Sequence, residues 1–299
     1  MSGILITGGS GQLGNALQAL AAMRGLPFSV VSRPDFDFEK PQTVAACFVG
    51  ALPSLVINAA AYTAVDAAES NPAAAKAGNH TGPLQLAELC AAVDIPFIHV
   101  STDYVFDGSK GQPYTEDDAT APSGVYGRTK RDGEEAILAT AAKAIILRTA
   151  WVYAAYGRNF ARTMLNAARK TNVLRVVADQ RGTPTAAPDL AAAILDIVKI
   201  LQAGGWKPAY RGIYHATGSG ETSWYGFAKA IFAAAPPEFP HPSITPITTA
   251  DWPTPARRPA DSRLDCCKIA KIFGVRLPDW RSSLPPIVAA LIEMDAPRP

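Results

Sequence analysis

Residues 3–14 of the chain read Gly-Ile-Leu-Ile-Thr-Gly-Gly-Ser-Gly-Gln-Leu-Gly, and this stretch decides the fold class. Its apolar start predicts a buried strand, and the periodic pattern of residues 12–24 predicts a helix directly behind the glycines. Gly8, Gly11 and Gly14 would permit a tight turn, close approach of the backbone to a pyrophosphate, and close packing of helix on strand. We therefore expect this loop to bind a dinucleotide, with a purely structural turn as the alternative.

The alternation of apolar runs and helical patterns continues along the chain. We expect strands at residues 28–32, 55–58, 96–101, 144–147, 174–177 and 212–216. We expect helices at residues 71–92, 128–140, 188–202, 223–233, 268–273 and 286–294. Strands that are apolar throughout and separated by helices favour a parallel sheet covered on both faces. The predicted fold class is a Rossmann-type, doubly wound α/β domain with a smaller C-terminal α/β substrate domain.

The division into domains follows from the same pattern. We predict an NAD(P)-binding Rossmann domain at residues 1–150, to which 172–217 partly returns. Residues 151–171 and 218–299 would form the smaller domain. Prolines crowd residues 236–259, and because proline removes a donor and stiffens the backbone, this stretch predicts irregular, semi-rigid walls of a ligand cleft.

Charge and composition exclude several classes of partner. The net charge is +2, from 28 Lys and Arg against 26 Asp and Glu, so the chain has no global field that would attract nucleic acid or acidic lipid. The most apolar later segment, residues 186–203, is interrupted by charges and a proline, so we expect no membrane span. The start of the chain lacks a signal-peptide pattern, and we expect a cytoplasmic enzyme. The four cysteines and four histidines show no ligand spacing, so no metal site is predicted.

The end of the second predicted strand bears on the choice of cofactor. An NAD-binding chain commonly has an acid there, because a carboxylate accepts a hydrogen bond from the ribose 2′-hydroxyl. Here the strand ends at Ser32-Arg33, and a guanidinium suits a 2′-phosphate. We therefore expect NADPH, with use of NADH left open. The alternative is that Arg33 is a solvated loop charge.

A candidate catalytic set lies at and beyond the fourth strand. Ser101-Thr102-Asp103-Tyr104 follows that strand, at the edge where open α/β sheets bind ligands. Tyr126 and Lys130 are four residues apart and share one helix face. A nearby ammonium lowers the pKa of a phenol from about 10, so we expect Lys130 to assist Tyr126 as proton donor to a carbonyl. Lys130 would also bind the nicotinamide ribose, and Thr102 would orient the carbonyl.

With these motifs the chain resembles the extended short-chain dehydrogenase/reductase family, over essentially its whole length. The Gly loop and the Tyr/Lys pair are generic to that family. More specific runs are Asn58-Ala59-Ala60-Ala61-Tyr62-Thr63-Ala64-Val65-Asp66, Ser101-Thr102-Asp103-Tyr104-Val105-Phe106-Asp107-Gly108, Arg148-Thr149-Ala150-Trp151-Val152-Tyr153, Asp179-Gln180-Arg181-Gly182-Thr183-Pro184-Thr185 and Arg258-Pro259-Ala260-Asp261-Ser262-Arg263-Leu264. They resemble the branch that reduces dTDP-linked 4-keto-6-deoxy sugars. The implied reaction is NADPH-dependent reduction of the C4 ketone of dTDP-4-dehydro-β-L-rhamnose to dTDP-L-rhamnose.

The resemblance also implies roles for individual residues. The implied catalytic residues are Thr102, Tyr126 and Lys130. The expected cofactor contacts are Gly8, Gly11, Gln12, Leu13, Gly14, Arg33, Asp37, Phe38, Ala59, Ala60, Tyr62, Tyr126 and Lys130. The expected sugar-nucleotide contacts are Thr102, Asp103, Tyr104, Trp151 and Asn159. The chain departs from the family pattern at Asp261, often Asn, and at Ala154, often Gly.

Some members of the family dimerise through a metal held by C-terminal acids. The tail here carries few acids, Glu293 and Asp295 among them, so that metal is not carried over and dependence on Mg²⁺ stays open. The expected state is a monomer or a homodimer.

Apart from the resemblance, the chemistry of two features suggests contact with the substrate. Trp151 follows a strand end, where its ring would stack on a sugar or base or pack in the core. Arg257, Arg258 and Arg263 would clamp a diphosphate or remain solvated.

Two other functions remain open. An epimerase or 4,6-dehydratase of the same family would regenerate its bound NAD, and Asp103 beside Thr102 could serve a dehydratase as acid. A reductase consumes NADPH stoichiometrically, which separates the two. A non-catalytic NADP-binding regulatory subunit would bind cofactor without turnover, and the complete set of Thr102, Tyr126 and Lys130 argues against it.

Overall fold

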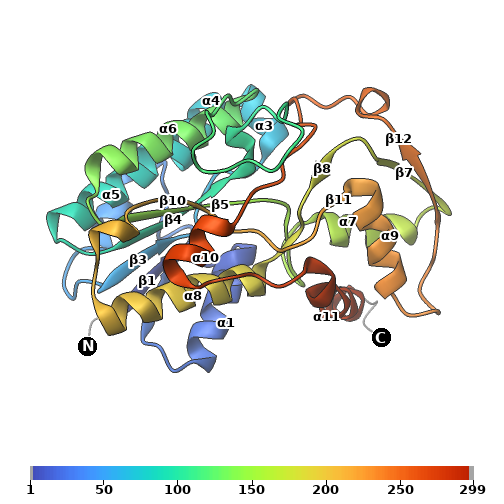
Figure 1. The fold of residues 1–299 in the computed structure, drawn as a ribbon. Coiled ribbons are helices and arrows are strands. Elements are labelled where there is room, and N and C mark those ends of the chain that lie inside the picture. Colours follow the sequence, from blue (N-terminus) through green and yellow to red (C-terminus); the bar gives the residue numbers. More distant parts are fainter. Residues whose placement is uncertain (1–2, 296–299) are drawn as a thin grey trace.

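A parallel sheet of six strands organises the larger part of the molecule (Figure 1). The computed structural model describes residues 3–295. The strand order is β10-β5-β4-β3-β1-β2, and every neighbouring pair is parallel. The strands are β1 (Ile4–Thr7), β2 (Phe28–Val31), β3 (Leu55–Asn58), β4 (Phe97–Thr102), β5 (Ala144–Thr149) and β10 (Gly212–His215). The predicted Rossmann-type sheet is confirmed.

The direction of winding reverses next to β1. This strand pairs with β2 on one side and β3 on the other, so that Thr7 lies level with Val31 and with Asn58. The segment that follows β1 leads to one face of the sheet, and the segment that follows β3 leads to the other face. Such a switch point leaves a crevice, which is where doubly wound folds bind their ligands.

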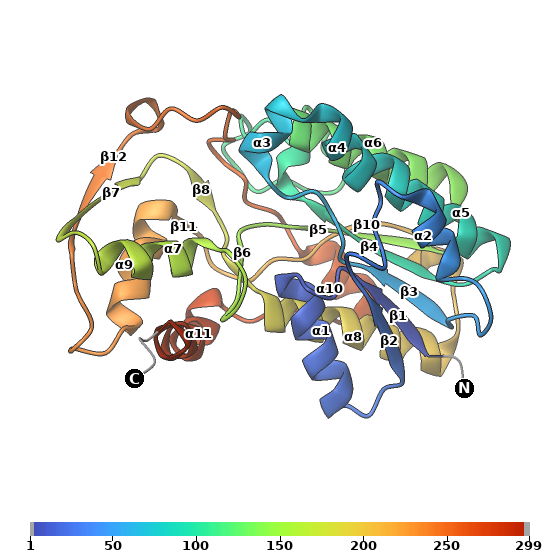
Figure 2. The same ribbon diagram turned by 180° about the vertical axis from the view of Figure 1, so that it is seen from behind.

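Helices cover both faces of the sheet (Figures 1 and 2). One face carries α1 (Gln12–Met23) and α8 (Ala187–Gly204), whose apolar sides form one core with β1, β3 and β5. The other face carries α2 (Pro41–Ala46), α3 (Val65–Ser70), α4 (Pro72–Lys76), α5 (Gly82–Ala92) and α6 (Val125–Thr140). Side chains of α2, α5 and α6 form a second core with the sheet.

The helix expected at residues 71–92 is interrupted. A π-helical turn, η1 (Ala77–Thr81), separates α4 from α5. At this turn the Asn79 side chain accepts a hydrogen bond from Tyr62 N at 2.9 Å and donates to Tyr62 O at 3.1 Å. The widened turn therefore anchors the segment that follows β3 at the ligand edge of the sheet.

A smaller region with its own core stands beside the sheet. It contains the parallel pair β7 (Val173–Val177) and β12 (Ser243–Ile247), with α7 (Phe160–Ala168), α9 (Trp224–Ala234) and α11 (Trp280–Met294). Two further short ladders pair β6 (Val152–Tyr153) with β9 (Thr185–Ala186), and β8 (Arg181–Gly182) with β11 (Thr222–Ser223). Single 3₁₀ turns are η2 (Asp103–Val105), η3 (Pro208–Tyr210) and η4 (Thr249–Asp251).

Two expectations based on proline are wrong. The proline-rich stretch is not entirely irregular, because β12 runs through it and includes Pro246, which an edge strand tolerates. Helix α11 begins at Trp280 rather than at residue 286, and Pro285 and Pro286 lie inside it. Its start is set by the Asp279 side chain, which accepts a hydrogen bond from Arg281 N at 2.8 Å.

The boundary between the regions also differs from the expected one. Within residues 172–217, β7 packs in the smaller core, whereas α8, η3 and β10 return to the larger region. Helix α10 (Cys267–Phe273), expected in the smaller domain, packs in the larger core because Phe273 lies against Tyr210 and Tyr214, with ring centroids 5.0 and 5.1 Å apart.

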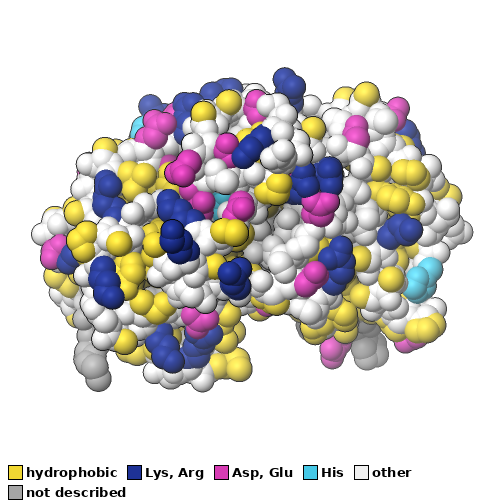
Figure 3. Space-filling view, viewed as in Figure 1, with side chains coloured by type: hydrophobic (Ala, Val, Ile, Leu, Met, Phe, Trp, Pro, Cys, Tyr) yellow, Lys and Arg dark blue, Asp and Glu magenta, His cyan; other side chains and the backbone are white. Residues whose placement is uncertain are grey.

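Charges are dispersed over the surface. On the face in Figure 3, Lys and Arg side chains alternate with Asp and Glu, as the small net charge predicts. None of the helices within residues 3–295 combines the length and apolar character needed to cross a bilayer.

Candidate active site

A cavity of about 860 Å³ lies at the carboxyl ends of the parallel strands. Its walls come from both regions of the molecule. One wall consists of the Gly loop, the segments after β2, β3 and β4, and two side chains of α6. The facing wall includes Trp151, Val152, Gly157, Arg158, Trp224 and Arg258.

The Gly loop has the geometry of a diphosphate cradle. Gly8 has φ of +72°, and a Cβ there would lie 2.6 Å from Ala60 N. A Cβ on Gly14 would lie 2.1 Å from Gly8 O, so this glycine allows α1 to approach the loop and does not itself line the cavity. Gly11 caps α1 without a side-chain hydrogen bond, which leaves the first N–H groups of the helix available to an anion. Gln12 and Leu13 line the cavity beside it.

The segment after β2 lines the far end of this wall. Arg33, Asp37 and Phe38 lie there as expected, together with Phe36 and Glu39, which the sequence analysis missed. The Arg33 guanidinium is two-thirds exposed and pairs with Asp37 at 3.3 Å and with Glu39 at 3.2 Å. The expected cation is therefore present but shares its charge with two carboxylates.

The segment after β3 contributes Ala59, Ala60 and Tyr62 to the cavity. Ala60 N donates a hydrogen bond to the Asn58 side chain at 3.1 Å. Tyr62 is held by Asn79, and Gly78 approaches it so closely that a Cβ there would lie 2.9 Å from Tyr62 N. The backbone of this segment is thus fixed from both sides.

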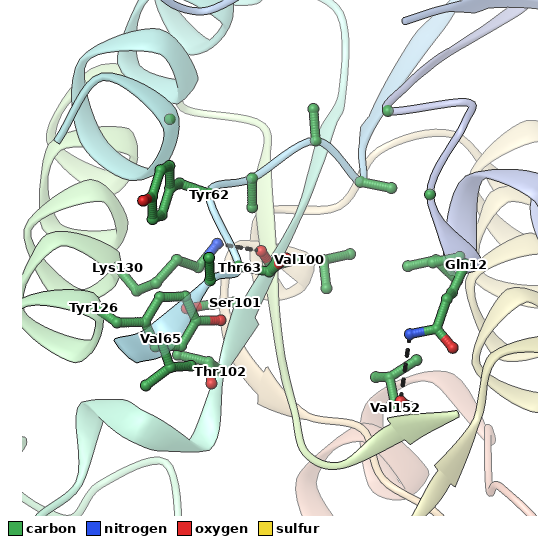
Figure 4. A pocket seen from close by; sticks show the side chains of 18 of the residues that line it. Gln12, Tyr62, Thr63, Val65, Val100, Ser101, Thr102, Tyr126, Lys130 and Val152 are labelled. Atoms are coloured by element: carbon green, nitrogen blue, oxygen red, sulfur yellow. Dashed lines mark hydrogen bonds between the residues drawn. The ribbon is translucent and has the colours of Figure 1, made fainter. Parts of the chain in front are cut away.

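The structure brings Thr102, Tyr126 and Lys130 to one wall of the cavity (Figure 4). Thr102 ends β4, and its hydroxyl donates to Asp103 Oδ1 at 2.9 Å and accepts from Tyr104 N at 3.2 Å. Tyr126 and Lys130 project from the first turns of α6, and the Tyr126 phenol lies beside Thr102 on this wall (Figure 4). Thr102 and Tyr126 can therefore hold the same carbonyl oxygen.

The expected effect of Lys130 on Tyr126 is wrong in this structure. Burial raises the pKa of Tyr126, with smaller contributions from Asp103 and Tyr104, and only the hydrogen bond with Thr102 opposes the rise. Lys130 does not counter it, because its Nζ turns away and donates to Val100 O at 2.7 Å (Figure 4). A phenol with a raised pKa keeps its proton at neutral pH, which is the state that a proton donor requires.

Lys130 and Asp103 also have displaced pKa values. Burial lowers the pKa of Lys130 to about 8, and Glu134, one turn farther along α6, partly opposes that change. Burial raises the pKa of Asp103 to about 6, although the hydrogen bond from Thr102 acts in the other direction. Groups that change charge near neutral pH in a cleft are typical of active sites.

Two tryptophans form the facing wall. Trp151 has φ of +48°, a left-handed backbone that is uncommon for an aromatic residue, and its ring stacks on Trp224 with centroids 3.5 Å apart and planes at 9°. Both rings line the cavity. Trp151 therefore packs on a neighbour and faces the cavity at the same time. Trp224 was missed, since its only sequence signal is its place at the start of a helix.

The structure does not place Asn159, an expected sugar-nucleotide contact, in the cavity lining. Its side chain caps α7 by accepting from Arg162 N at 3.0 Å, and its amide donates to Gln12 Oε1 at 3.0 Å and to Ala154 O at 2.8 Å. It lines neither cavity described here. Gln12 donates in turn to Val152 O at 3.4 Å, so this group joins the two walls (Figure 4).

Of the three candidate arginines, only Arg258 lines the cavity. It donates to Tyr104 Oη at 2.9 Å and pairs with Asp66 at 2.6 Å. Arg263 pairs instead with Asp261 and Glu221. Arg258 and Tyr104 also border a second cavity of about 350 Å³, into which Trp252 and Thr254 of the proline-rich stretch project.

Residues 3–295 contain no group of three or more His, Cys, Asp or Glu side chains placed to hold a metal ion. Of the two tail acids, Asp295 pairs with Arg162 at 3.1 Å.

Comparison with known proteins identifies the family. Residues 1–292 match the model of the RmlD substrate binding domain. The dTDP-4-dehydrorhamnose reductase of Sinorhizobium fredii is 44% identical over 296 residues, which cover 97% of each chain. The crystal structure of a dTDP-4-dehydrorhamnose reductase from Clostridium acetobutylicum has a TM-score of 0.88 at 37% identity, covering 96% of this chain and 99% of that one.

A second solved structure bears on the cofactor. The dTDP-4-dehydrorhamnose reductase of Bacillus anthracis, determined in complex with NADP, has a TM-score of 0.88 at 30% identity and covers 97% of this chain and 99% of its own. The family match spans nearly the whole chain, and the curated relatives are reductases. The chain therefore belongs to the RmlD substrate-binding domain family, and it is an oxidoreductase with a Rossmann-type fold.

Proposed function

We propose that the protein reduces the C4 ketone of dTDP-4-dehydro-β-L-rhamnose to dTDP-L-rhamnose with NADPH. One observation carries the proposal: a single cavity joins the diphosphate cradle of the Gly loop to a buried, protonated phenol and an aromatic wall. The first feature suits a dinucleotide, the second suits a carbonyl that gains a proton, and the third suits a sugar nucleotide. The names of the curated relatives support the choice of this substrate.

The side chains supply the proton and the orientation for this reaction. NADPH, when bound, supplies the hydride. Thr102 and Tyr126 would both hydrogen-bond the C4 oxygen, because both hydroxyl groups lie on the same wall of the cavity (Figure 4). As C4 gains the hydride, its oxygen becomes a far stronger base than a phenolate and takes the proton of Tyr126. Thr102 would stabilise the resulting Tyr126 phenolate if its hydroxyl proton, which points to Asp103 Oδ1 in this structure, turned towards the phenolate oxygen.

The cofactor would lie between the Gly loop and α6. The open N–H groups at the start of α1 would bind the diphosphate, and Lys130 would reach the nicotinamide ribose. Arg33 would bind the 2′-phosphate, which has to compete with Asp37 and Glu39 for the guanidinium. NADPH remains the proposed cofactor, with a preference over NADH limited by this competition.

A 4,6-dehydratase is the second candidate, and Asp103 is the observation that favours it. Its carboxyl group lies next to Thr102 and has a pKa raised to about 6, so a larger fraction of it is protonated near neutral pH than of an ordinary aspartic acid. Such a group can protonate a leaving hydroxyl. A dehydratase, however, returns the hydride to its product and leaves the nicotinamide unchanged.

One assay separates the candidates. The protein is mixed with NADPH and dTDP-4-dehydro-β-L-rhamnose, and both nicotinamide absorbance and product are quantified. We expect one NADPH consumed for each dTDP-L-rhamnose formed. Turnover of a sugar nucleotide without loss of NADPH would favour the dehydratase or an epimerase, and cofactor binding without turnover would favour a regulatory subunit.

A further inference from the structure

A buried chain of polar side chains runs behind the catalytic wall. Thr7 of β1, Asn58 of β3 and His99 of β4 are fully buried, and Lys130 of α6 is 1% exposed. Asn58 Nδ2 lies 2.8 Å from His99 Nδ1, and His99 Nε2 lies 3.3 Å from Lys130 Nζ. Burying these polar side chains costs free energy unless each one has a hydrogen-bond partner. Each donor must therefore face an acceptor, and this requirement lets the direction of each hydrogen bond be deduced.

The orientation of Asn58 is fixed at its oxygen. Its Oδ1 accepts from Thr7 Oγ1 at 2.5 Å and from Ala60 N at 3.1 Å. The second donor is a backbone N–H, which cannot reverse its role. Turning the amide would place two donors against each other, so the Asn58 NH₂ group faces His99.

The tautomer of His99 follows from that orientation. Nδ1 receives a hydrogen bond from Asn58 and therefore carries no proton. Burial lowers the pKa of His99 well below its usual value, with Lys130 acting in the same direction, so the ring is neutral and its proton is on Nε2. This Nε2–H points at Lys130 Nζ.

An Nε2–H donor and an ammonium group do not suit each other, because an ammonium has donors only. A neutral amine does suit the site: it accepts from His99 Nε2–H and donates to Val100 O at 2.7 Å. We propose that His99 is a positioning residue that, held by Asn58 as the Nε2–H tautomer, favours the neutral amine of Lys130 over the ammonium.

The other groups around Lys130 act in different ways. Burial lowers its pKa to about 8, the same direction as the proposed effect of His99. Glu134 raises it, but this carboxylate is itself held by Arg148 at 2.6 Å in a buried pair. Tyr126 on the preceding turn keeps its proton, and Tyr62 faces Lys130 from the segment after β3 (Figure 4).

Two variants separate the effect of the His99 hydrogen bond on Lys130 from the effect of burial. His99→Phe keeps a ring of similar shape in place and removes the Nε2–H donor, so the proton affinity of Lys130 should rise about tenfold. Asn58→Asp supplies an acceptor to Nδ1, should move the His99 proton there and should also raise the Lys130 pKa. Burial alone predicts no rise in His99→Phe. The matched control is His241→Phe at an exposed histidine, which should leave Lys130 unchanged.

The measurement is NMR on the cofactor-free protein. ¹⁵N-labelled histidine reports the His99 tautomer, and ¹³C-labelled lysine reports the titration of Lys130, assigned with Lys130→Arg. We expect Nε2–H in the unsubstituted protein and the shifts described for the variants. Nδ1–H in the unsubstituted protein overturns the proposal even if both variants fail to fold, and so does an unchanged or lowered Lys130 pKa in His99→Phe. The inference rests on the proposed function only in that Lys130 is assigned to the nicotinamide ribose. The NMR measurements need neither substrate nor cofactor. A failure of this inference is therefore distinguishable from a failure of the proposed function.

Discussion

The two walls of the cavity differ in how the chain builds them. The catalytic wall comes from residues that directly follow parallel strands and from two side chains on consecutive turns of α6. The facing wall is assembled from Trp151, Trp224 and Arg258, which are far apart in sequence. Local motifs thus supply the proposed cofactor site and the proposed proton donor, whereas tertiary packing supplies the surface that we propose contacts the substrate.

The walls also differ in how firmly they are held. Thr102, Tyr126 and Lys130 are buried, and the side chains of Thr102 and Lys130 are hydrogen-bonded to neighbouring groups. Arg258 is only partly buried and depends on its contacts with Asp66 and Tyr104. Changes in the catalytic wall should therefore affect chemistry and cofactor binding, and changes in the facing wall should affect substrate affinity.

The largest effect is expected for Tyr126→Phe. The substitution removes the proton donor and keeps the ring, so kcat should fall roughly 10²- to 10⁴-fold. The affinity for NADPH, followed by fluorescence titration, should stay within about twofold of the original because the Gly loop is untouched. A kcat within threefold of the original protein would remove Tyr126 from the proposed mechanism.

The second-largest effect is expected for Gly14→Ala, which should weaken cofactor binding. Its Cβ would lie 2.1 Å from Gly8 O, and since backbone cannot move aside cheaply, α1 must shift from the loop. NADPH binding should weaken at least tenfold, or about 1.4 kcal/mol. In Gly204→Ala the new Cβ meets no atom within 4 Å, so this variant controls for a generic effect of alanine. Equal affinity for NADPH in Gly14→Ala and Gly204→Ala would contradict the proposal that the Gly loop binds the diphosphate.

Trp224→Ala tests the facing wall. It removes the partner on which Trp151 stacks, so KM for the sugar nucleotide should rise about tenfold, a loss on the order of 1.4 kcal/mol, while KM for NADPH changes little. Steady-state kinetics in both substrates give the two values. Trp206→Ala, in the larger core, is the matched control and should alter stability alone. A larger effect on NADPH than on the sugar nucleotide would reverse the assignment of the walls.

The smallest effect is expected for Arg33→Ala. The guanidinium is exposed and shared with two carboxylates, so the preference for NADPH over NADH should fall only about fivefold, close to 1 kcal/mol. The ratio of kcat/KM values for the two cofactors measures it. Arg24→Ala, which removes another surface ion pair, should leave the ratio unchanged. No change in Arg33→Ala would mean that the guanidinium does not reach the 2′-phosphate.

The contrast between the walls also explains what sequence could predict. The Gly loop, Thr102 and the pair Tyr126 and Lys130 are recognisable because their chemistry depends on strand ends and on a spacing of four. Spacing does not tell where a long side chain turns, and Lys130 reaches Val100 and His99 rather than lowering the pKa of Tyr126.

Other errors share a different cause. Asn159 is a polar residue before a helix, and its side chain serves as the cap of that helix. Trp224 becomes part of the cavity only through its stacking on Trp151. Asn58 and His99 lie within apolar strands, so their pairing follows from the order β4-β3-β1 and not from any local pattern.

The most direct test of the account follows the hydride itself. NADPH carrying deuterium at the transferable position of its nicotinamide is used with dTDP-4-dehydro-β-L-rhamnose, and the product is analysed by NMR and mass spectrometry. The account predicts dTDP-L-rhamnose with one deuterium, bound to C4, and the proton on its oxygen exchangeable with solvent. A product without deuterium, or with deuterium at another carbon, would contradict it.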